Sequence, residues 1–195
     1  MTTASPGTHP RSETDRVAAG IARAARWRVL GLLLERPRAG WNAEIERLAA
    51  EIGDPPLRAV VVAARDATEG EYHALLGPGA PLSPREASVL GAGDPGWMLA
   101  ELARFYDAFG YVPRAEDPPD HVAVEAGFVG FLELKESLAW ANEDAEAAQT
   151  VAAARAAFVA AHLAPLVARL ERAADLAPDS HVALTVDLLR TQIDG

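Results

Sequence analysis

Residues 117–132 read DPPDHVAVEAGFVGFL, and this stretch decides the fold. Asp117 has a side chain suited to a helix N-cap, and Pro118 suits the first helical position, where a missing backbone N–H costs nothing. Asp120 adds negative charge near the positive end of the helix dipole. Apolar side chains then recur at helical spacing, at Val124, Phe128, Phe131 and Leu132.

We expect this central helix to cover about residues 118–141. Gly127 and Gly130 lie inside it, although glycine in a helix interior costs about 1 kcal/mol relative to alanine. Close approach of a second helix is the usual reason to keep such glycines, so we expect a neighbouring helix to pack here. His121 and Glu125 are four residues apart, which places them on one face where they can pair.

Helical patterns continue on both sides of this stretch. The chain is rich in alanine, leucine, arginine and glutamate and has few β-branched runs, a composition that favours helix. The pattern Ser83-Pro84-Arg85-Glu86 predicts a capping box at a further helix start. Other helices are expected at about residues 14–35, 42–52, 55–68, 95–109, 143–170 with a kink at Pro165, and 180–193.

The sequence therefore predicts an all-α fold, a single-domain helical bundle of seven or more helices. Residues 12–195 are expected to form this domain. Residues 1–11 are rich in threonine, serine, proline and glycine and show no apolar period, so we expect a disordered tail there.

Composition excludes several classes of function. The formal net charge of −10 disfavours nucleic acid and anionic membranes as partners, because both need clustered basic residues. The absence of cysteine rules out disulfides, thiolate metal sites and cysteine nucleophiles. No unbroken apolar run approaches the roughly 20 residues that span a bilayer, so we expect no stable membrane insertion and a cytoplasmic protein.

Sequence motifs of common enzymes are missing. The chain has no Gly-x-Ser-x-Gly elbow, no Walker loop and no Gly-x-Gly-x-x-Gly pattern. Helix capping accounts for most of the carboxylates near His121, so we expect no enzyme, no cofactor and no metal. One alternative stays open, a metal-dependent hydrolase that uses His121, Glu125 and His162.

Three stretches resemble the TorD/DmsD/NarJ-like family of molybdoenzyme-specific chaperones. Residues 118–125 match its proline, Asp-His pair and Glu one turn later. Residues 158–165 match a second motif with Phe, His-Leu and Pro, although Leu166 replaces the tryptophan often found after the proline. The third is an aromatic-aliphatic cluster before the Gly/Pro-rich loop 77–81, formed by Tyr72, Leu75 and Leu76.

The resemblance implies a cytoplasmic chaperone that binds the leader peptide, often a twin-arginine signal, or the apo form of a molybdenum-containing oxidoreductase subunit. It would assist cofactor insertion, assembly and timely export as a monomer or dimer. Tyr72, Leu75 and Leu76 would line an apolar groove for the peptide, and Pro118 would stiffen its mouth. Asp120 and Glu125 would pair with client arginines beside His121.

These roles predict that Asp120→Ala and His121→Ala weaken peptide binding and leave helicity unchanged. A helical adaptor with another client is a second alternative. A molybdoenzyme catalytic subunit encoded next to this chain would favour the chaperone, and stoichiometric metal in the purified protein would favour the hydrolase.

Overall fold

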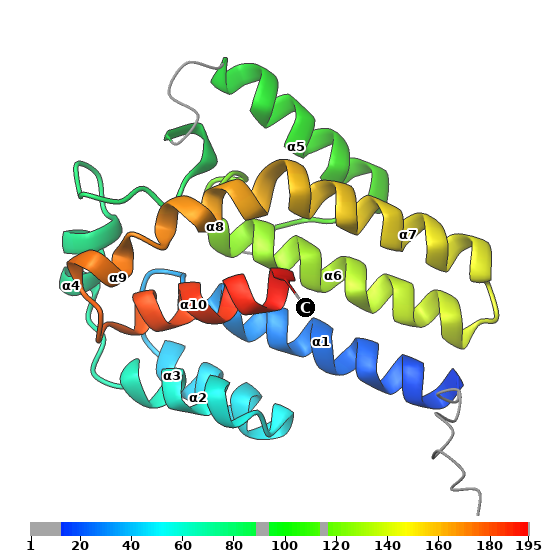
Figure 1. Ribbon diagram of the computed structural model, residues 1–195, viewed down its shortest axis with the longest axis horizontal. Coiled ribbons are helices and arrows are strands. Elements are labelled where there is room, and N and C mark those ends of the chain that lie inside the picture. The colour runs from blue at the N-terminus through cyan, green and yellow to red at the C-terminus, as the bar shows by residue number, and fades with distance from the viewer. Residues whose placement is uncertain (1–12, 89–93, 114–116, 195) are drawn as a thin grey trace, which may run out of the picture.

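The computed structural model describes residues 13–88, 94–113 and 117–194, and the tail expected at residues 1–11 lies outside them. The described chain forms a single all-α domain, as the sequence predicts (Figure 1). Its α-helices are α1 (Glu13–Leu33), α2 (Trp41–Ile52), α3 (Pro55–Ala63), α4 (Glu69–Leu76), α5 (Pro95–Phe109), α6 (Val122–Ala141), α7 (Ala145–Phe158), α8 (Ala164–Leu170), α9 (Ala173–Leu176) and α10 (His181–Asp194). A 3₁₀ turn, η1 (Glu86–Ser88), precedes α5, and a π-helical turn, η2 (Val159–Leu163), joins α7 to α8.

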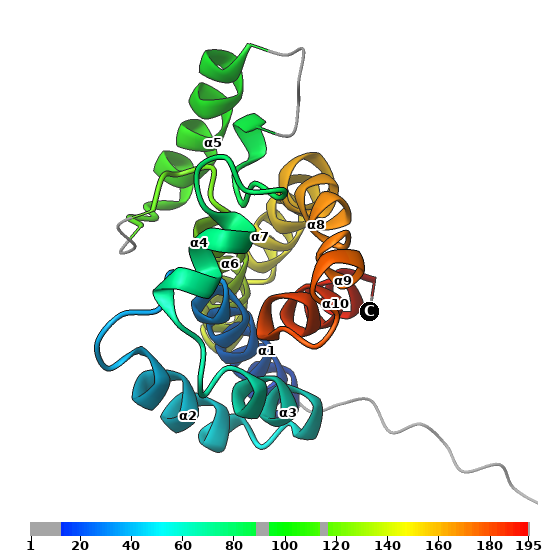
Figure 2. The same ribbon diagram turned by 90° about the vertical axis from the view of Figure 1, so that its left-hand side faces the viewer.

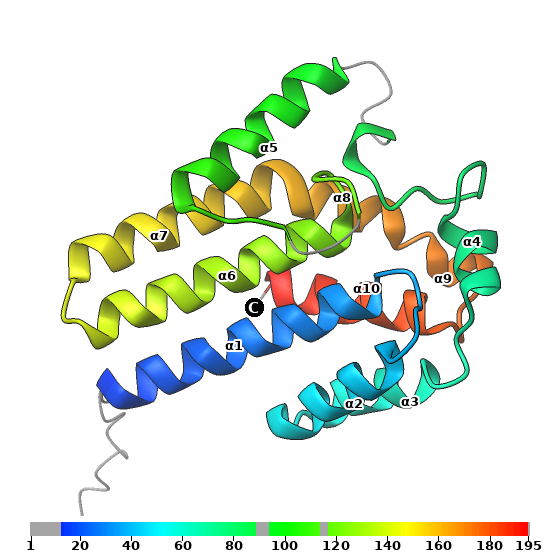
Figure 3. The same cartoon turned by 180° about the vertical axis from the view of Figure 1, so that it is seen from behind.

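The two long helices α1 and α6 lie side by side along the bundle (Figure 3). Glycine permits this approach, because a Cβ on Gly130 would lie 3.0 Å from Trp27 Cβ and 3.1 Å from the Ala24 carbonyl oxygen. The prediction of a packed neighbour is thus confirmed for Gly130. Gly127 faces a different group, and a Cβ there would lie 2.7 Å from Tyr111 Oη.

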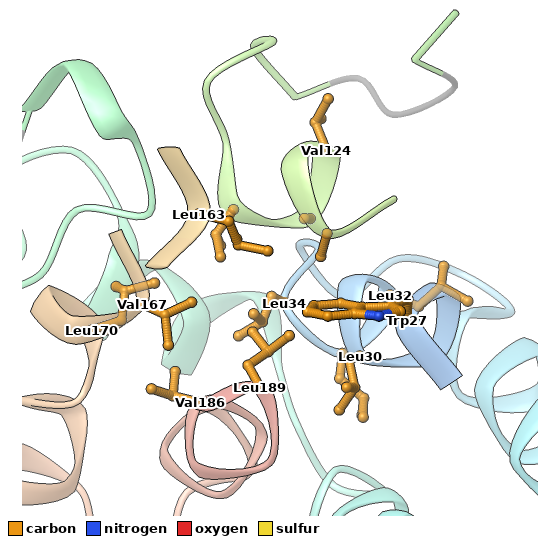
Figure 4. Close-up of a cluster of buried hydrophobic side chains, with 14 of the residues drawn as sticks. Trp27, Leu30, Leu32, Leu34, Val124, Leu163, Val167, Leu170, Val186 and Leu189 are labelled. Carbon is orange, nitrogen blue, oxygen red and sulfur yellow. The ribbon is translucent and has the colours of Figure 1, made fainter. Parts of the chain in front are cut away.

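The core forms where α1, α6, α8 and α10 converge (Figure 4). Aliphatic side chains from these helices interlock there, and burial of apolar surface of this kind supplies most of the free energy of folding. The fully buried members include Leu30, Leu32, Leu33, Leu34, Leu132, Leu163, Leu166, Val167 and Leu189.

Helix α5 lies at the outer edge of the bundle, far from α2 and α3 (Figure 2). Large aromatic side chains connect it to the body. The ring centroid of Phe105 lies 5.3 Å from that of Phe158, and the Tyr106 centroid lies 4.9 Å from that of Phe128. Edge-to-face contacts at these distances suit the charge distribution of aromatic rings.

Two predicted helix starts are wrong. Helix α6 begins at Val122, and its N-cap is His121 rather than Asp117. Pro118 belongs to a turn before the helix, in which His121 N donates to the Pro118 carbonyl. The predicted capping box at residues 83–86 opens only the short turn η1, where the Ser83 hydroxyl accepts from Arg85 N at 3.3 Å.

The expected kink at Pro165 takes the form of the π-helical turn η2. Proline has no backbone N–H to donate and clashes with the carbonyl four residues earlier. A π-helical turn changes the hydrogen-bond register just before Pro165, so α7 continues through η2 into α8 without a break.

The rod Ala145–Leu170 is long and apolar enough to cross a membrane, by length and composition only. No unbroken apolar run marks this segment in the sequence, because Arg155 and His162 interrupt it. One such helix is weak evidence for a membrane span, because core helices of soluble proteins have the same length and composition. Arg155 is paired within the bundle, with Glu133 at 3.1 Å and Glu136 at 3.1 Å.

Candidate functional site

The start of α6 is built around the buried imidazole of His121. Its Nδ1 accepts from the backbone N–H of Ala123 at 3.2 Å, which caps the helix. The neutral ring therefore carries its proton on Nε2, which donates to the Tyr72 hydroxyl oxygen at 3.0 Å. Burial lowers the pKa of His121 and keeps this neutral form, although the Asp117 carboxylate opposes that shift.

Asp120 forms a buried ion pair with Arg85. The guanidinium donates through both Nε and Nη2 to Asp120 Oδ1, at 3.0 and 2.9 Å. The second oxygen, Oδ2, accepts from the backbone N–H of Ala87 at 3.1 Å. The carboxylate is fully buried while the Arg85 side chain is 42% exposed, so the arginine closes over the acid from the solvent side.

Backbone contacts fasten this region further. Glu86 N donates to the Asp120 carbonyl at 2.9 Å, and Val122 N donates to the Pro84 carbonyl at 2.8 Å. These two bonds form an isolated antiparallel bridge between the segment before α5 and the start of α6. The Tyr106 hydroxyl also donates to the Pro119 carbonyl at 2.8 Å, which holds the proline turn in place.

One turn further into α6, Glu125 is completely buried beside a second buried acid, Glu86. Burial raises the pKa of Glu125 well above its ordinary value, and the nearby charges of Glu86 and Asp120 add to the shift. Glu86 accepts from His162 Nδ1 at 3.1 Å, so α6, η1 and η2 meet at this polar cluster. A hydrogen bond between the Glu125 and Glu86 side chains raises the pKa of Glu125 further, because two carboxyl groups can share such a bond only while one of them keeps its proton.

The structure thus brings most of the predicted site residues together, but inside the protein. Tyr72 and His121 share a hydrogen bond, whereas Asp120 and Glu125 face Arg85 and Glu86. Leu76 is buried too, while Leu75 and Pro118 are partly exposed. Direct pairing of a client arginine with Asp120 or Glu125 stays a prediction that needs these carboxylates to be uncovered.

The two histidines of the alternative metal-dependent hydrolase have separate partners. His121 bonds Tyr72 and the backbone of Ala123, whereas His162 bonds Glu86. Across residues 13–88, 94–113 and 117–194, no group of three or more His, Cys, Asp or Glu side chains is arranged to hold a metal ion.

An open groove of about 610 Å³ lies on the other side of the start of α6. Figure 3 looks onto the face where α1 and α6 lie side by side and form its walls. Most of its lining is apolar, and Ile21 and Leu134 are 47% and 39% exposed. The lining side chains include Ile21, Ala24, Ala25, Tyr111, Val112, Ala123, Val124, Phe131 and Leu134. We call this the α1–α6 groove.

Charged groups gather at one end of the α1–α6 groove. Arg28 and Glu35 line it, and Arg28 Nη1 donates to Glu35 Oε1 at 3.3 Å. Burial raises the pKa of Glu35 above its ordinary value, and the negative charge of Asp117 adds to this rise. The positive charges of Arg28 and Arg38 oppose it. Asp117 is therefore close enough to Glu35 for their charges to interact. Its side chain is 24% exposed, and Oδ1 lies 4.0 Å from His121 Nε2.

Sequence reasoning missed both the α1–α6 groove and the partner of Asp120. Apolar side chains, Ile21 among them, cover much of the circumference of α1, a pattern typical of a helix buried on several sides, so the sequence gives no sign that Ile21 stays exposed. Arg85 was read as part of a capping box. The pairing of Arg85 with Asp120 joins residues 35 positions apart, so no local pattern reveals it.

Comparison with known families matches residues 35–172 to the model described as nitrate reductase delta subunit. The match covers well over half of the chain and includes the α6 start, Arg85, Glu86 and His162. The chain belongs to the nitrate reductase delta subunit family. The search of curated proteins found no match.

The nitrate reductase delta subunit family consists of cytoplasmic chaperones for the maturation of molybdoenzymes. Its members act with nitrate reductase-type molybdoenzyme subunits and are chaperones rather than enzymes. The resemblance seen in residues 118–125 and 158–165 is therefore confirmed at the level of this family.

Proposed function

We propose that this chain binds an N-terminal segment of an apo-molybdoenzyme catalytic subunit in the α1–α6 groove and holds it until the cofactor has been inserted. The observation that carries the proposal is an open apolar groove beside the family motif. Its size of about 610 Å³ lies within the range of ligand pockets, and exposed side chains extend its rim. Those rim residues are Ile21, Val112 and Leu134.

The expected occupant is an apolar helix-forming segment that is preceded by basic residues. An amphipathic helix lays its apolar face into a groove of this kind, with anchors one turn apart. Exposed apolar side chains in a continuous patch mark such interaction sites, because isolated ones are normal but clusters leave much apolar surface in water. A leader with an arginine pair before its apolar stretch fits this description.

Asp117 is the carboxylate best placed to meet the basic end of such a leader. Its side chain is partly exposed and close enough to Glu35, at the charged end of the α1–α6 groove, for their charges to interact, whereas Glu35 itself is buried and paired with Arg28. This role replaces direct contact by Asp120, which would instead hold the groove wall in position through Arg85 and the start of α6. The net charge of −10 favours the approach of a basic leader over long range.

Calorimetric titration with the N-terminal segment of the catalytic subunit encoded next to this chain tests the proposal. Leu134→Asp places a carboxylate against the apolar face of the bound segment, where it finds no partner. We expect it to weaken binding at least about tenfold, which is about 1.4 kcal/mol.

Leu184→Asp is the matched control. Leu184 is 37% exposed, close to the 39% of Leu134, but it lies on α10 outside the α1–α6 groove. The same charge is added in both variants, so affinity should be unchanged in Leu184→Asp. Equal weakening in both variants, or in neither, would contradict the assignment of the groove.

A further inference from the structure

A second, smaller hollow of about 230 Å³ lies between the loop after α4 and the junction of α8 and α9. These segments lie at the left-hand end of Figure 1. All the charged side chains that line it are arginines, Arg169 and Arg172. The remaining lining residues are Ala80, Pro81, Leu82, Ser83, Ser88 and Leu170. We call it the arginine pocket.

The arginine pocket is unusual because its two guanidiniums have no partner within the described chain. Most described arginines pair with carboxylates, as Arg23 does with Glu133 and Arg85 does with Asp120. Among residues 13–88, 94–113 and 117–194, the side chains of four arginines have no ion pair, hydrogen bond or ring contact. They are Arg58, Arg104, Arg169 and Arg172.

Two of these unpaired arginines thus line one hollow in a chain whose net charge is −10. We propose that the arginine pocket binds a phosphate group of a small ligand, with Arg169 and Arg172 as its charged donors and Ser83 and Ser88 as hydroxyl donors. The planar guanidinium presents several N–H groups that match phosphate oxygens, often two at a time.

The size and walls of the arginine pocket define the kind of ligand. Its volume of about 230 Å³ lies below the range of about 300–1,000 Å³ typical of drug-sized ligands, so it suits one phosphate or diphosphate group. Leu82 and Leu170 are buried and contribute apolar surface to its lining. No carboxylate lines the pocket, so no fixed negative charge in it repels the ligand.

The site is separate from the α1–α6 groove, so the proposal goes beyond the proposed chaperone function and stands or falls independently of it. Calorimetric titration of the full chain with inorganic pyrophosphate tests it. The native chain should bind about one equivalent, and Arg169→Gln/Arg172→Gln should weaken binding at least about tenfold. Both side chains are exposed, so the melting temperature of this variant should stay unchanged.

Arg58→Gln/Arg104→Gln is the matched control, because it removes the same charge from arginines that are also exposed and unpaired but lie elsewhere. It should leave the affinity for pyrophosphate within about twofold of the native value, since scattered exposed charges interact weakly at physiological salt. Equal weakening in the two double variants would mean that only overall charge matters and would overturn the proposal.

Two further ligands identify the source of the phosphate. A nucleoside diphosphate that binds as tightly as pyrophosphate means that the pocket reads the phosphates alone, and tighter binding means that it also contacts the rest of the ligand. Citrate, an anion without phosphate, should bind at least about tenfold more weakly, because carboxylates lack the tetrahedral set of oxygens. Citrate binding as tight as that of pyrophosphate, or no pyrophosphate binding by the native chain, would contradict the site.

Discussion

The start of α6 and the α1–α6 groove share one helix and differ in almost every physical property. The start of α6 is polar, buried and internally satisfied through Arg85, Tyr72 and backbone groups. The groove is apolar and open, and Leu134 and Ile21 remain partly in water. The polar motif at the start of α6 thus holds segments of the fold together, while the open apolar surface lies beside it.

Asp120→Ala tests whether the motif at the start of α6 stabilises the fold or is an open binding site. We expect a loss of about 3 kcal/mol in the free energy of unfolding, the lower end of the range for breaking a buried ion pair, because the remaining Arg85 is partly exposed. Denaturant titration followed by circular dichroism measures this loss.

Asp117→Ala is the control for that variant. Asp117 is 24% exposed and lies 4.0 Å from His121 Nε2, a contact worth less than about 1 kcal/mol. If Asp120→Ala and the native protein unfold at the same denaturant concentration, the ion pair of Asp120 with Arg85 does not stabilise the fold.

Tyr72→Phe sharpens the comparison, because it removes one hydroxyl and keeps the aromatic ring. His121 Nε2 then loses its acceptor at 3.0 Å, and we expect a loss of about 1 kcal/mol in stability. Tyr72 does not line the α1–α6 groove, so the affinity for the client segment should be unchanged. A variant with native stability and weakened client binding would place Tyr72 in the binding surface instead.

Glu125→Gln tests the buried acid cluster through pH. The folded state raises the pKa of Glu125 above the ordinary value of 4.5, so the folded chain keeps a proton that the unfolded chain releases. Stability from this group is present below pH 4.5 and is lost as pH rises toward the folded pKa. Glutamine does not titrate, so the variant should lose this decline.

The measurement is the difference in unfolding free energy between native and Glu125→Gln proteins, followed from below pH 4.5 upward. The difference isolates Glu125 because Glu35, whose pKa is also raised, contributes equally to both proteins. His121 and His181 have lowered pKa values, so their stabilisation is present above pH 6.5 and is lost as pH falls, again in both proteins. A difference that does not change with pH would show that Glu125 is not held neutral by burial.

The sequence was sufficient for most of the long helices and for the family motif, but the helix expected at residues 55–68 ends at Ala63, and α4 at Glu69–Leu76 was not predicted. Apolar spacing predicted α5 at residues 95–109, and the glycines of α6 predicted a close neighbour, which is α1 at Gly130. The start of α6 was misplaced because Asp117 has a side chain typical of an N-cap, whereas the histidine that caps the helix is not among the preferred cap residues. The structure uses the carboxylate of Asp120 for Arg85, and the neutral imidazole of His121 caps the helix.

The α1–α6 groove was beyond prediction for a different reason. Its walls come from α1, α6 and the residues after α5, and an apolar stripe on a helix looks the same whether a neighbour covers it or not. Leu134 and Leu132 have the same chemistry in sequence, yet Leu132 is fully buried and Leu134 is 39% exposed. Only the arrangement of helices separates core from binding surface.

The most direct test of the central claim uses the absence of native cysteine, which makes every introduced thiol unique. Single variants Leu134→Cys in the α1–α6 groove, Pro119→Cys at the exposed motif turn and Leu184→Cys on α10 are each exposed to a thiol reagent with and without the client segment. A client segment bound in the α1–α6 groove should slow the labelling of Leu134→Cys and leave that of the other two variants unchanged. Protection at Pro119→Cys with none at Leu134→Cys would contradict binding in the groove.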